Sequence, residues 1–221
     1  MTNSIAARID QPNVPAALGT GTFVAACFVA WLAVILLLGA NGAFVPAPGA
    51  PPLALLIALL APLGVFAVGY RSSRSLRAFV RSADLRVIAG LQGWRWAGFG
   101  FLALATYRVL PAIFAWPAGL GDMTIGVTAP LVLTSLLRRP DFAASKRFVA
   151  WNLGGILDLT VAVTIGAVGP LVVPSFYSAV STAPMSRLPL VLIPTYLVPA
   201  FLMLHFTALI QARRLKKEAT R

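Results

Sequence analysis

The sequence Y-R-V-L-P-A-I-F-A-W-P-A-G-L-G-D, from Tyr107 to Asp122, places two charged side chains within strongly apolar surroundings. Its prolines and glycines predict a tight turn between two helices, or a break in one. A charged side chain within membrane sequence is costly and is usually held by a partner. The stretch is therefore a candidate for a site, with Arg108 and Asp122 as its charged members.

The composition of the whole chain indicates that the bilayer is its solvent. The chain has 221 residues, of which 59% are hydrophobic and 11% are charged, and its mean hydropathy is +0.86. Soluble proteins carry about 25% charged residues. A water-soluble fold would have too little polar sequence to cover its surface, so an integral membrane protein is expected. The single cysteine, Cys27, excludes a disulfide framework or a cysteine metal cluster within one chain.

The apolar runs predict an all-α bundle of six transmembrane helices. The first run is longer than the apolar core of a signal peptide and is expected to be retained. A polar N-terminal tail (1–21) and a basic C-terminal tail (212–221) flank the transmembrane domain (22–211). The expected spans are about 22–40, 53–70, 96–116, 120–137, 147–168 and 188–211.

Between the second and third spans, Arg71, Arg74, Arg77 and Arg81 recur at three- and four-residue spacing among apolar residues. This pattern predicts a basic amphipathic helix, within residues 71–95, that lies on the membrane surface against anionic phospholipid headgroups. A basic connector that only sets the topology is the alternative.

The distribution of basic residues predicts the orientation. With both termini on one side, that side receives every one of the 18 lysines and arginines except Arg108 and Arg187. The positive-inside rule makes this side cytoplasmic. The net charge of +12 is thus explained by topology, and nucleic-acid binding is not expected because no soluble basic domain is present.

Ionisable residues within the spans are the remaining candidates. Counted from the cytoplasmic ends, Arg108 and Asp122 lie roughly 20 Å and 24 Å deep, and Asp158 and His205 roughly 16 Å and 12 Å deep. Arg108 and Asp122 are predicted to pair, either as a clamp on the helix hairpin or as a ligand site. Alternatively, Asp122 lies solvated among the outer headgroups.

Asp158 and His205 are expected to contact each other, as packing residues or as a proton or ligand site. Gly154 and Gly155 would let another helix approach Asp158, and Asn152 would hydrogen-bond across a helix interface. Catalytic, metal-binding and cofactor-binding motifs are absent from the sequence, so no cofactor is expected and an enzyme is disfavoured.

Four segments are similar to a group of small uncharacterised bacterial multi-pass membrane proteins. They are L-P-A-I-F-A-W-P-A-G-L-G-D, G-V-T-A-P, W-N-L-G-G-I-L-D-L-T-V-A and L-P-L-V-L-I-P-T, and the likeness covers about residues 90–211. The resemblance implies a bacterial inner membrane and no particular chemistry.

Three functions are therefore open. The chain is a small transporter-like protein with a buried polar site, or a membrane scaffold or accessory subunit that acts as a homo-oligomer or with partners. A membrane-embedded enzyme or redox protein is the third possibility.

Overall fold

The computed structural model describes residues 16–47 and 49–219, and helices are the only regular structure in this part of the chain. The prediction of an all-α fold is thus confirmed for it. Five of its helices are long and apolar enough to cross a membrane. They are α2 (Ala16–Ala40), α3 (Leu53–Ser72), α7 (Ala112–Arg138), α8 (Lys146–Ala167), and α10 (Val198–Ala219) with the π-helix η5 (Ile193–Leu197) that precedes it.

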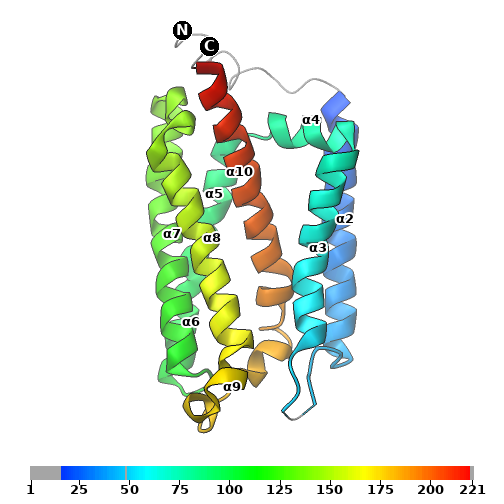
Figure 1. The fold of residues 1–221 in the computed structure, drawn as a ribbon, viewed down its shortest axis with the longest axis vertical. Coiled ribbons are helices and arrows are strands. Elements are labelled where there is room, and N and C mark those ends of the chain that lie inside the picture. The colour runs from blue at the N-terminus through cyan, green and yellow to red at the C-terminus, as the bar shows by residue number, and fades with distance from the viewer. Residues whose placement is uncertain (1–15, 48, 220–221) are drawn as a thin grey trace.

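Shorter helices follow one another between α3 and α7. They are α4 (Arg74–Ser82), α5 (Leu85–Gln92), the 3-10 helix η1 (Gly93–Gly98) and α6 (Phe99–Thr106). The last three succeed each other without a gap and form one helical run beside α7 (Figure 1). Asp84 begins this run, because its carboxylate accepts a hydrogen bond from the backbone N–H of Arg86 at 2.7 Å.

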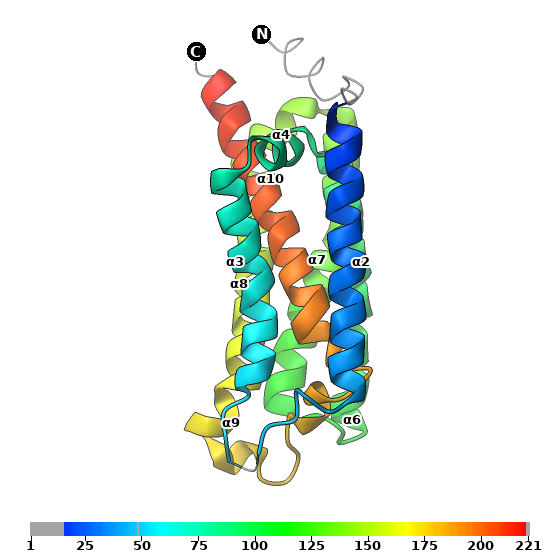
Figure 2. The same cartoon turned by 90° about the vertical axis from the view of Figure 1, so that its right-hand side faces the viewer.

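Helices α6, α7 and α8 run alongside one another, and α10 packs against α8 on one side and α3 on the other (Figure 1). Helices α2 and α3 overlap in this view, but Figure 2 shows them apart, with α10 between them. Helix α4 lies across the end of the molecule at which α2 begins and α10 ends (Figure 2). Gln211 of α10 holds α4 there, since its Nε2 donates to the carbonyls of Val80 and Ala83 at 2.9 and 2.8 Å.

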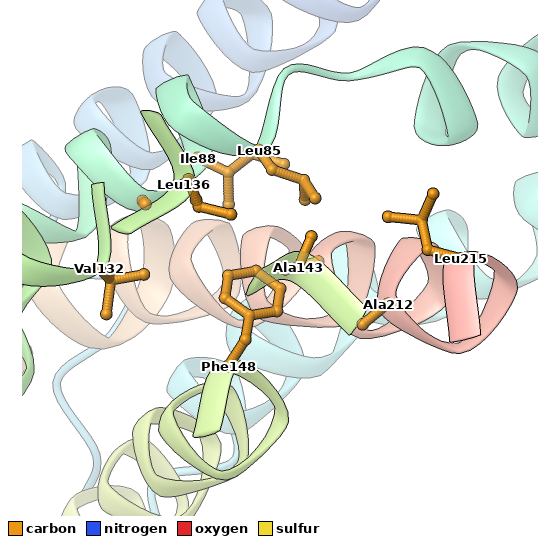
Figure 3. Packing of buried hydrophobic residues seen from close by; sticks show 10 residues of the cluster. Leu85, Ile88, Val132, Leu136, Ala143, Phe148, Ala212 and Leu215 are labelled. Carbon is orange, nitrogen blue, oxygen red and sulfur yellow. The ribbon is translucent and has the colours of Figure 1, made fainter. Parts of the chain in front are cut away.

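An apolar core near this end fixes the run of short helices against three long ones. Leu85 and Ile88 of α5 meet Leu136 of α7, Phe148 of α8 and Ala212 of α10 (Figure 3). All five residues are nearly inaccessible to solvent. Burial of this kind stabilises the fold and places η1, the next element along the chain, between α7, α8 and α10.

The opposite end is closed by short segments between α8 and η5. They are α9 (Gly169–Val172), η3 (Pro174–Tyr177) and η4 (Ala183–Ser186). The Tyr177 hydroxyl donates to the carbonyl of Ile165 at 2.8 Å, and burial raises the pKa of this hydroxyl, which keeps it a neutral donor.

The expected third and fourth spans, 96–116 and 120–137, were placed wrongly. The helical run ends at Thr106, and α7 begins at Ala112. Pro111 lacks the N–H that would continue the earlier helix, and Arg108 has a φ of 56°, which turns the chain. The expected amphipathic segment 71–95 is likewise divided, because the chain is extended at Ala83 and Asp84.

Other expected bounds also differ. A turn stands where the sixth span was expected to begin, at 188, and the chain becomes helical only around Ile193. Helix α10 then extends to Ala219, so most of the expected C-terminal tail is helical. The expected N-terminal tail lies largely outside the described residues.

Candidate functional site

Arg95 occupies the centre of the bundle. It lies in η1, is 3% exposed, and its guanidinium reaches side chains of three long helices. The local 3-10 geometry is tighter than an α-helix, which is common where a helix carries a functional or strained position. A guanidinium has five N–H donors in a fixed plane and no acceptor, so a buried arginine needs several acceptors around it.

Two carboxylates bind the guanidinium. Nε donates to Oδ1 of Asp122 on α7 at 2.7 Å, and Nη2 donates to Oδ2 of Asp158 on α8. The side chains of Asp122 and Asp158 are 17% and 13% exposed, against 1% for Arg95. Removing charges from water is costly, and the pairing offsets this cost only because the partners are close and hydrogen-bonded.

A neutral imidazole is the third acceptor. Nη1 of Arg95 lies 3.1 Å from Nε2 of His205 on α10. Because a guanidinium only donates, Nε2 must accept, and the imidazole hydrogen is therefore on Nδ1. Nδ1 lies 2.9 Å from Oδ1 of Asn152, whose own Nδ2 donates to the carbonyl of Phe148 at 2.9 Å. Every bond is consistent with an uncharged His205.

Two glycines make room for these polar groups. A Cβ on Gly121 would lie 1.6 Å from Oδ1 of Asp158, and a Cβ on Gly155 would lie 2.2 Å from Nε2 of His205. Neither position could carry a side chain without displacing the polar groups. The expected role of Gly155 in close packing fits this geometry, whereas a Cβ on Gly154 would meet no atom within 4 Å.

Further glycines bring the backbone of η1 against α7. A Cβ on Gly126 would lie 2.1 Å from the backbone nitrogen of Trp96, and one on Gly98 would lie 2.5 Å from Cβ of Asp122. This close approach lets a side chain from η1 pass beside α7 and reach α8 and α10. Small residues at such contacts are typical of membrane helix pairs.

Aromatic rings enclose the polar groups. The ring of Phe201 lies 5.8 Å from Cζ of Arg95, and the ring of Trp151 meets His205 edge-on at 5.8 Å. Gln92, which is fully buried, donates to the carbonyl of Phe201 at 3.4 Å. Its Oε1 has no hydrogen-bond partner among the described residues. Low-dielectric surroundings of this kind strengthen each charge–charge contact.

A cavity of about 510 Å³ leads to one member of this group, Asp122. Its walls come mainly from the loop between α2 and α3, from α7 and α8 and from the short segments after α8, with single residues of α3, α6 and α10 and two of η5. Most of the walls are apolar, and they include the rings of Phe101, Phe114 and Tyr177. Asp122 is the only charged side chain among the described residues that line it.

The structure brings together four of the five predicted site residues. Asp122, Asp158, His205 and Asn152 all belong to the group around Arg95. Asp158 and His205 share no hydrogen bond with each other among the described contacts, so their expected contact is replaced by two contacts with Arg95. The interpretation of Asp122 as a solvated headgroup residue is wrong, because it is paired and largely buried.

The predicted pair of Arg108 and Asp122 is also wrong. Arg108 is exposed in the turn between α6 and α7, beyond the end of the helical run. The error follows from the misplaced third span, which put Arg108 within the membrane and Arg95 at its cytoplasmic edge. Because the run begins at Leu85, Arg95 lies near its middle instead.

Sequence reasoning missed Arg95, although the sequence contains a usable signal. Arg86 is followed by eight uncharged residues, so Arg95 stands apart from the basic cluster before it. Asp84 is a favourable N-cap for a helix beginning at Leu85, which would place Arg95 inside that helix.

A family model described as "Domain of unknown function (DUF8737)" matches residues 50–213. The match includes Arg95, its three hydrogen-bond partners Asp122, Asp158 and His205, and Asn152, which is hydrogen-bonded to His205. The chain belongs to the DUF8737 family. The DUF8737 match begins after α2 and runs from α3 into α10. No curated protein and no solved structure matches the chain.

Proposed function

We propose that the chain is a small transporter-like protein of a bacterial inner membrane, in which a ligand enters the cavity and reaches Asp122. The observation that carries the proposal is the junction of an apolar cavity with a buried ion-pair group. Ligand sites are mostly apolar with a few convergent polar groups, and volumes of about 300–1,000 Å³ are common. Ionisable residues within a membrane often mark a substrate path.

The proposed arrangement has six crossings. The run of α5, η1 and α6 would be the sixth in addition to the five long helices, since its length of about 33 Å is enough to cross a hydrocarbon core of about 30 Å. Contacts of Trp96 with Gly126, and of Phe101 with Phe114, support an antiparallel path along α7. A helix with a buried arginine is tolerated here because α7 and α8 provide carboxylates.

In this arrangement both termini are cytoplasmic. The described lysines and arginines, apart from Arg95, Arg108 and Arg187, belong to element ends and connections at the end where α10 finishes (Figure 1). The positive-inside rule supports assigning that end to the cytoplasm. Arg74 and Arg81 of α4 are exposed there, while Val80 is buried, which supports a surface helix facing anionic headgroups.

The cavity then opens on the side away from the cytoplasm, and the ion-pair group separates it from the cytoplasmic core around Phe148. Transport would require α7 and α8 to move relative to η1 so that Asp122 reaches the other side. Arg95 suits such a movement because its partners lie on three different helices. Alternating access by helix groups around a fixed central site is a known mode of transport.

Cysteine accessibility tests the proposal. In a Cys27→Ala background, Ala162→Cys places a thiol in the cavity wall, and Val127→Cys places one on the exposed apolar face of α7. We expect a small membrane-impermeant methanethiosulfonate to modify Ala162→Cys in intact cells and also, more slowly, in inside-out vesicles. A thiol in lipid stays protonated and unreactive, so Val127→Cys is the control. Equally slow modification of both would contradict the proposal.

A scaffold or accessory subunit is the second candidate, because almost no part of α2 is buried within the described chain. Apolar side chains such as Phe23, Val29 and Leu37 of α2 are largely exposed. Lipid alone satisfies such a surface, but a second copy of the chain would do so too. A specific oligomer that survives in detergent, together with an unreactive Ala162→Cys, would favour this function.

A further inference from the structure

The cluster of side chains around Arg95 carries one uncompensated negative charge. Arg95 supplies one positive charge, and Asp122 and Asp158 supply two negative charges when both are ionised. His205 is neutral by its hydrogen bonds, and Asn152 has no charge. The side chains that face the carboxylates are Arg95 from η1 and His205 from α10, with Tyr177 of η3 on the cavity wall. A buried excess charge is unfavourable, so a proton or another cation must balance it.

The excess charge is reachable from the cavity at one point. Asp122 lines the cavity, whereas Asp158 and His205 are absent from its described walls. Arg95 donates to Oδ1 of Asp122, and no described hydrogen bond reaches Oδ2. A cation in the cavity would therefore meet a carboxylate oxygen with free acceptor capacity.

The residues that line the cavity indicate which kind of ligand it would bind. They contain no described lysine or arginine that would attract an anion. Aromatic rings attract cations through their negative faces, and three rings line this space, those of Phe101, Phe114 and Tyr177. The apolar walls favour a bulky hydrocarbon body.

Resting on the proposed function, we propose that the cavity binds an amphipathic organic cation, an amine or quaternary onium with an apolar body, whose charge lies against Asp122. The cation competes with a proton for the same excess charge. Its binding to the protonated site releases the carboxyl proton to water and leaves the carboxylate paired with the ligand. The exchange balances without any further reactant.

Binding of tetraphenylphosphonium to the full chain in nanodiscs tests the proposal. We expect saturable binding that is weakened about tenfold for each pH unit of acidification once the carboxyl pair is protonated. Tetraphenylborate has nearly the same shape and the opposite charge, and we expect it neither to bind saturably nor to compete. Uptake of the probe by empty nanodiscs is measured and subtracted, which corrects for partition into lipid.

Three variants assign the binding to this site. Asp122→Asn should weaken binding by about tenfold or more through loss of the charge attraction. Ala162→Phe should abolish binding by filling the cavity while keeping both carboxylates of the ion pairs. Asp141→Asn, which removes an exposed carboxylate outside the cavity, should leave binding unchanged. If Asp122→Asn does not fold, the pH dependence of the unmodified chain and the Ala162→Phe variant still decide.

The possible failures are distinguishable. Tetraphenylborate could bind saturably and lose this binding in Ala162→Phe. The cavity would then bind a ligand but prefer an anion, and this result would overturn only the present inference. Phosphonium binding that is independent of pH would also overturn it. Failure of both probes to bind, with an unreactive Ala162→Cys, would overturn the proposed function as well.

Discussion

Arg95 connects four helices because a guanidinium can donate to several acceptors at once. Its three described partners lie on α7, α8 and α10, so each of these helices is tied to η1 through the same side chain. Removing one partner of a buried ion pair destabilises a protein more than replacing the whole pair with apolar residues, because it leaves a buried charge without a partner. The strongest predictions at the scale of single residues therefore concern Arg95.

Arg95→Gln should destabilise the fold by about 3–5 kcal/mol, since it leaves two carboxylates facing each other without a cation. Unfolding in mild detergent, followed by circular dichroism, measures the change. Arg108→Gln is the matched control and should have little effect, because Arg108 is exposed. Adding Asp158→Asn to Arg95→Gln should restore part of the loss, and the absence of any rescue would argue against charge as the cause.

The neighbouring glycines Gly154 and Gly155 offer a second comparison. Gly155→Ala should destabilise by about 1–3 kcal/mol, because its Cβ would overlap His205. Gly154→Ala meets open space and should stabilise α8 by up to about 1 kcal/mol. The same unfolding measurement decides, and equal effects of the two substitutions would contradict the packing around His205.

Most of the site's residues could be predicted from sequence, but their connections could not. Asp122, Asp158 and His205 were recognisable because ionisable residues are rare in apolar spans. Their partner was not, because Arg95 follows a row of arginines that belong to the membrane surface. Pairing depends on the rotation and depth of each helix, and a misplaced helix start changes both.

At the scale of elements, α4 is hydrogen-bonded to α10 through one side chain, Gln211. Gln211 donates to the carbonyls of Val80 and Ala83, at the C-terminal end of α4 where no intrahelical donor is available. Gln211→Met should therefore loosen α4 while preserving the bulk of the side chain. Hydrogen exchange in residues 76–84 should become about tenfold faster, as expected for a loss of about 1.4 kcal/mol.

The control for this prediction is Arg213→Met, since Arg213 is exposed on the same helix. It should leave exchange in α4 unchanged. Exchange that stays slow in Gln211→Met would show that α4 is held mainly by apolar contacts such as that of the buried Val80.

Element boundaries explain which parts of the fold were predictable. The apolar runs at 53–70 and 147–168 correspond closely to α3 and α8, because each has clear polar ends. The region from 85 to 111 was less clear, since Trp96 and Trp116 resemble the two ends of one span although they belong to η1 and α7. A 3-10 segment within a helical run has no strong sequence signature.

At the scale of the whole molecule, the number of crossings determines which ends share a side. Ser82 at the end of α4 and Ser178 after η3 are both exposed. Three crossings separate them if the run of α5, η1 and α6 spans the membrane, and two separate them if it does not. In a Cys27→Ala background, an impermeant thiol reagent should label Ser178→Cys in intact cells and Ser82→Cys only in inside-out vesicles. Labelling of both from one side would exclude six crossings.

The position of Arg95 also has a consequence for biogenesis. An arginine at the centre of a helix disfavours insertion by the translocon by about 2.5–3.5 kcal/mol. In the proposed six-crossing arrangement, the run from Leu85 to Thr106 is synthesised before the carboxylates of α7 and α8 that neutralise it. This run is therefore expected to remain beside the insertion machinery until both later helices emerge, so that three segments partition into lipid as one unit.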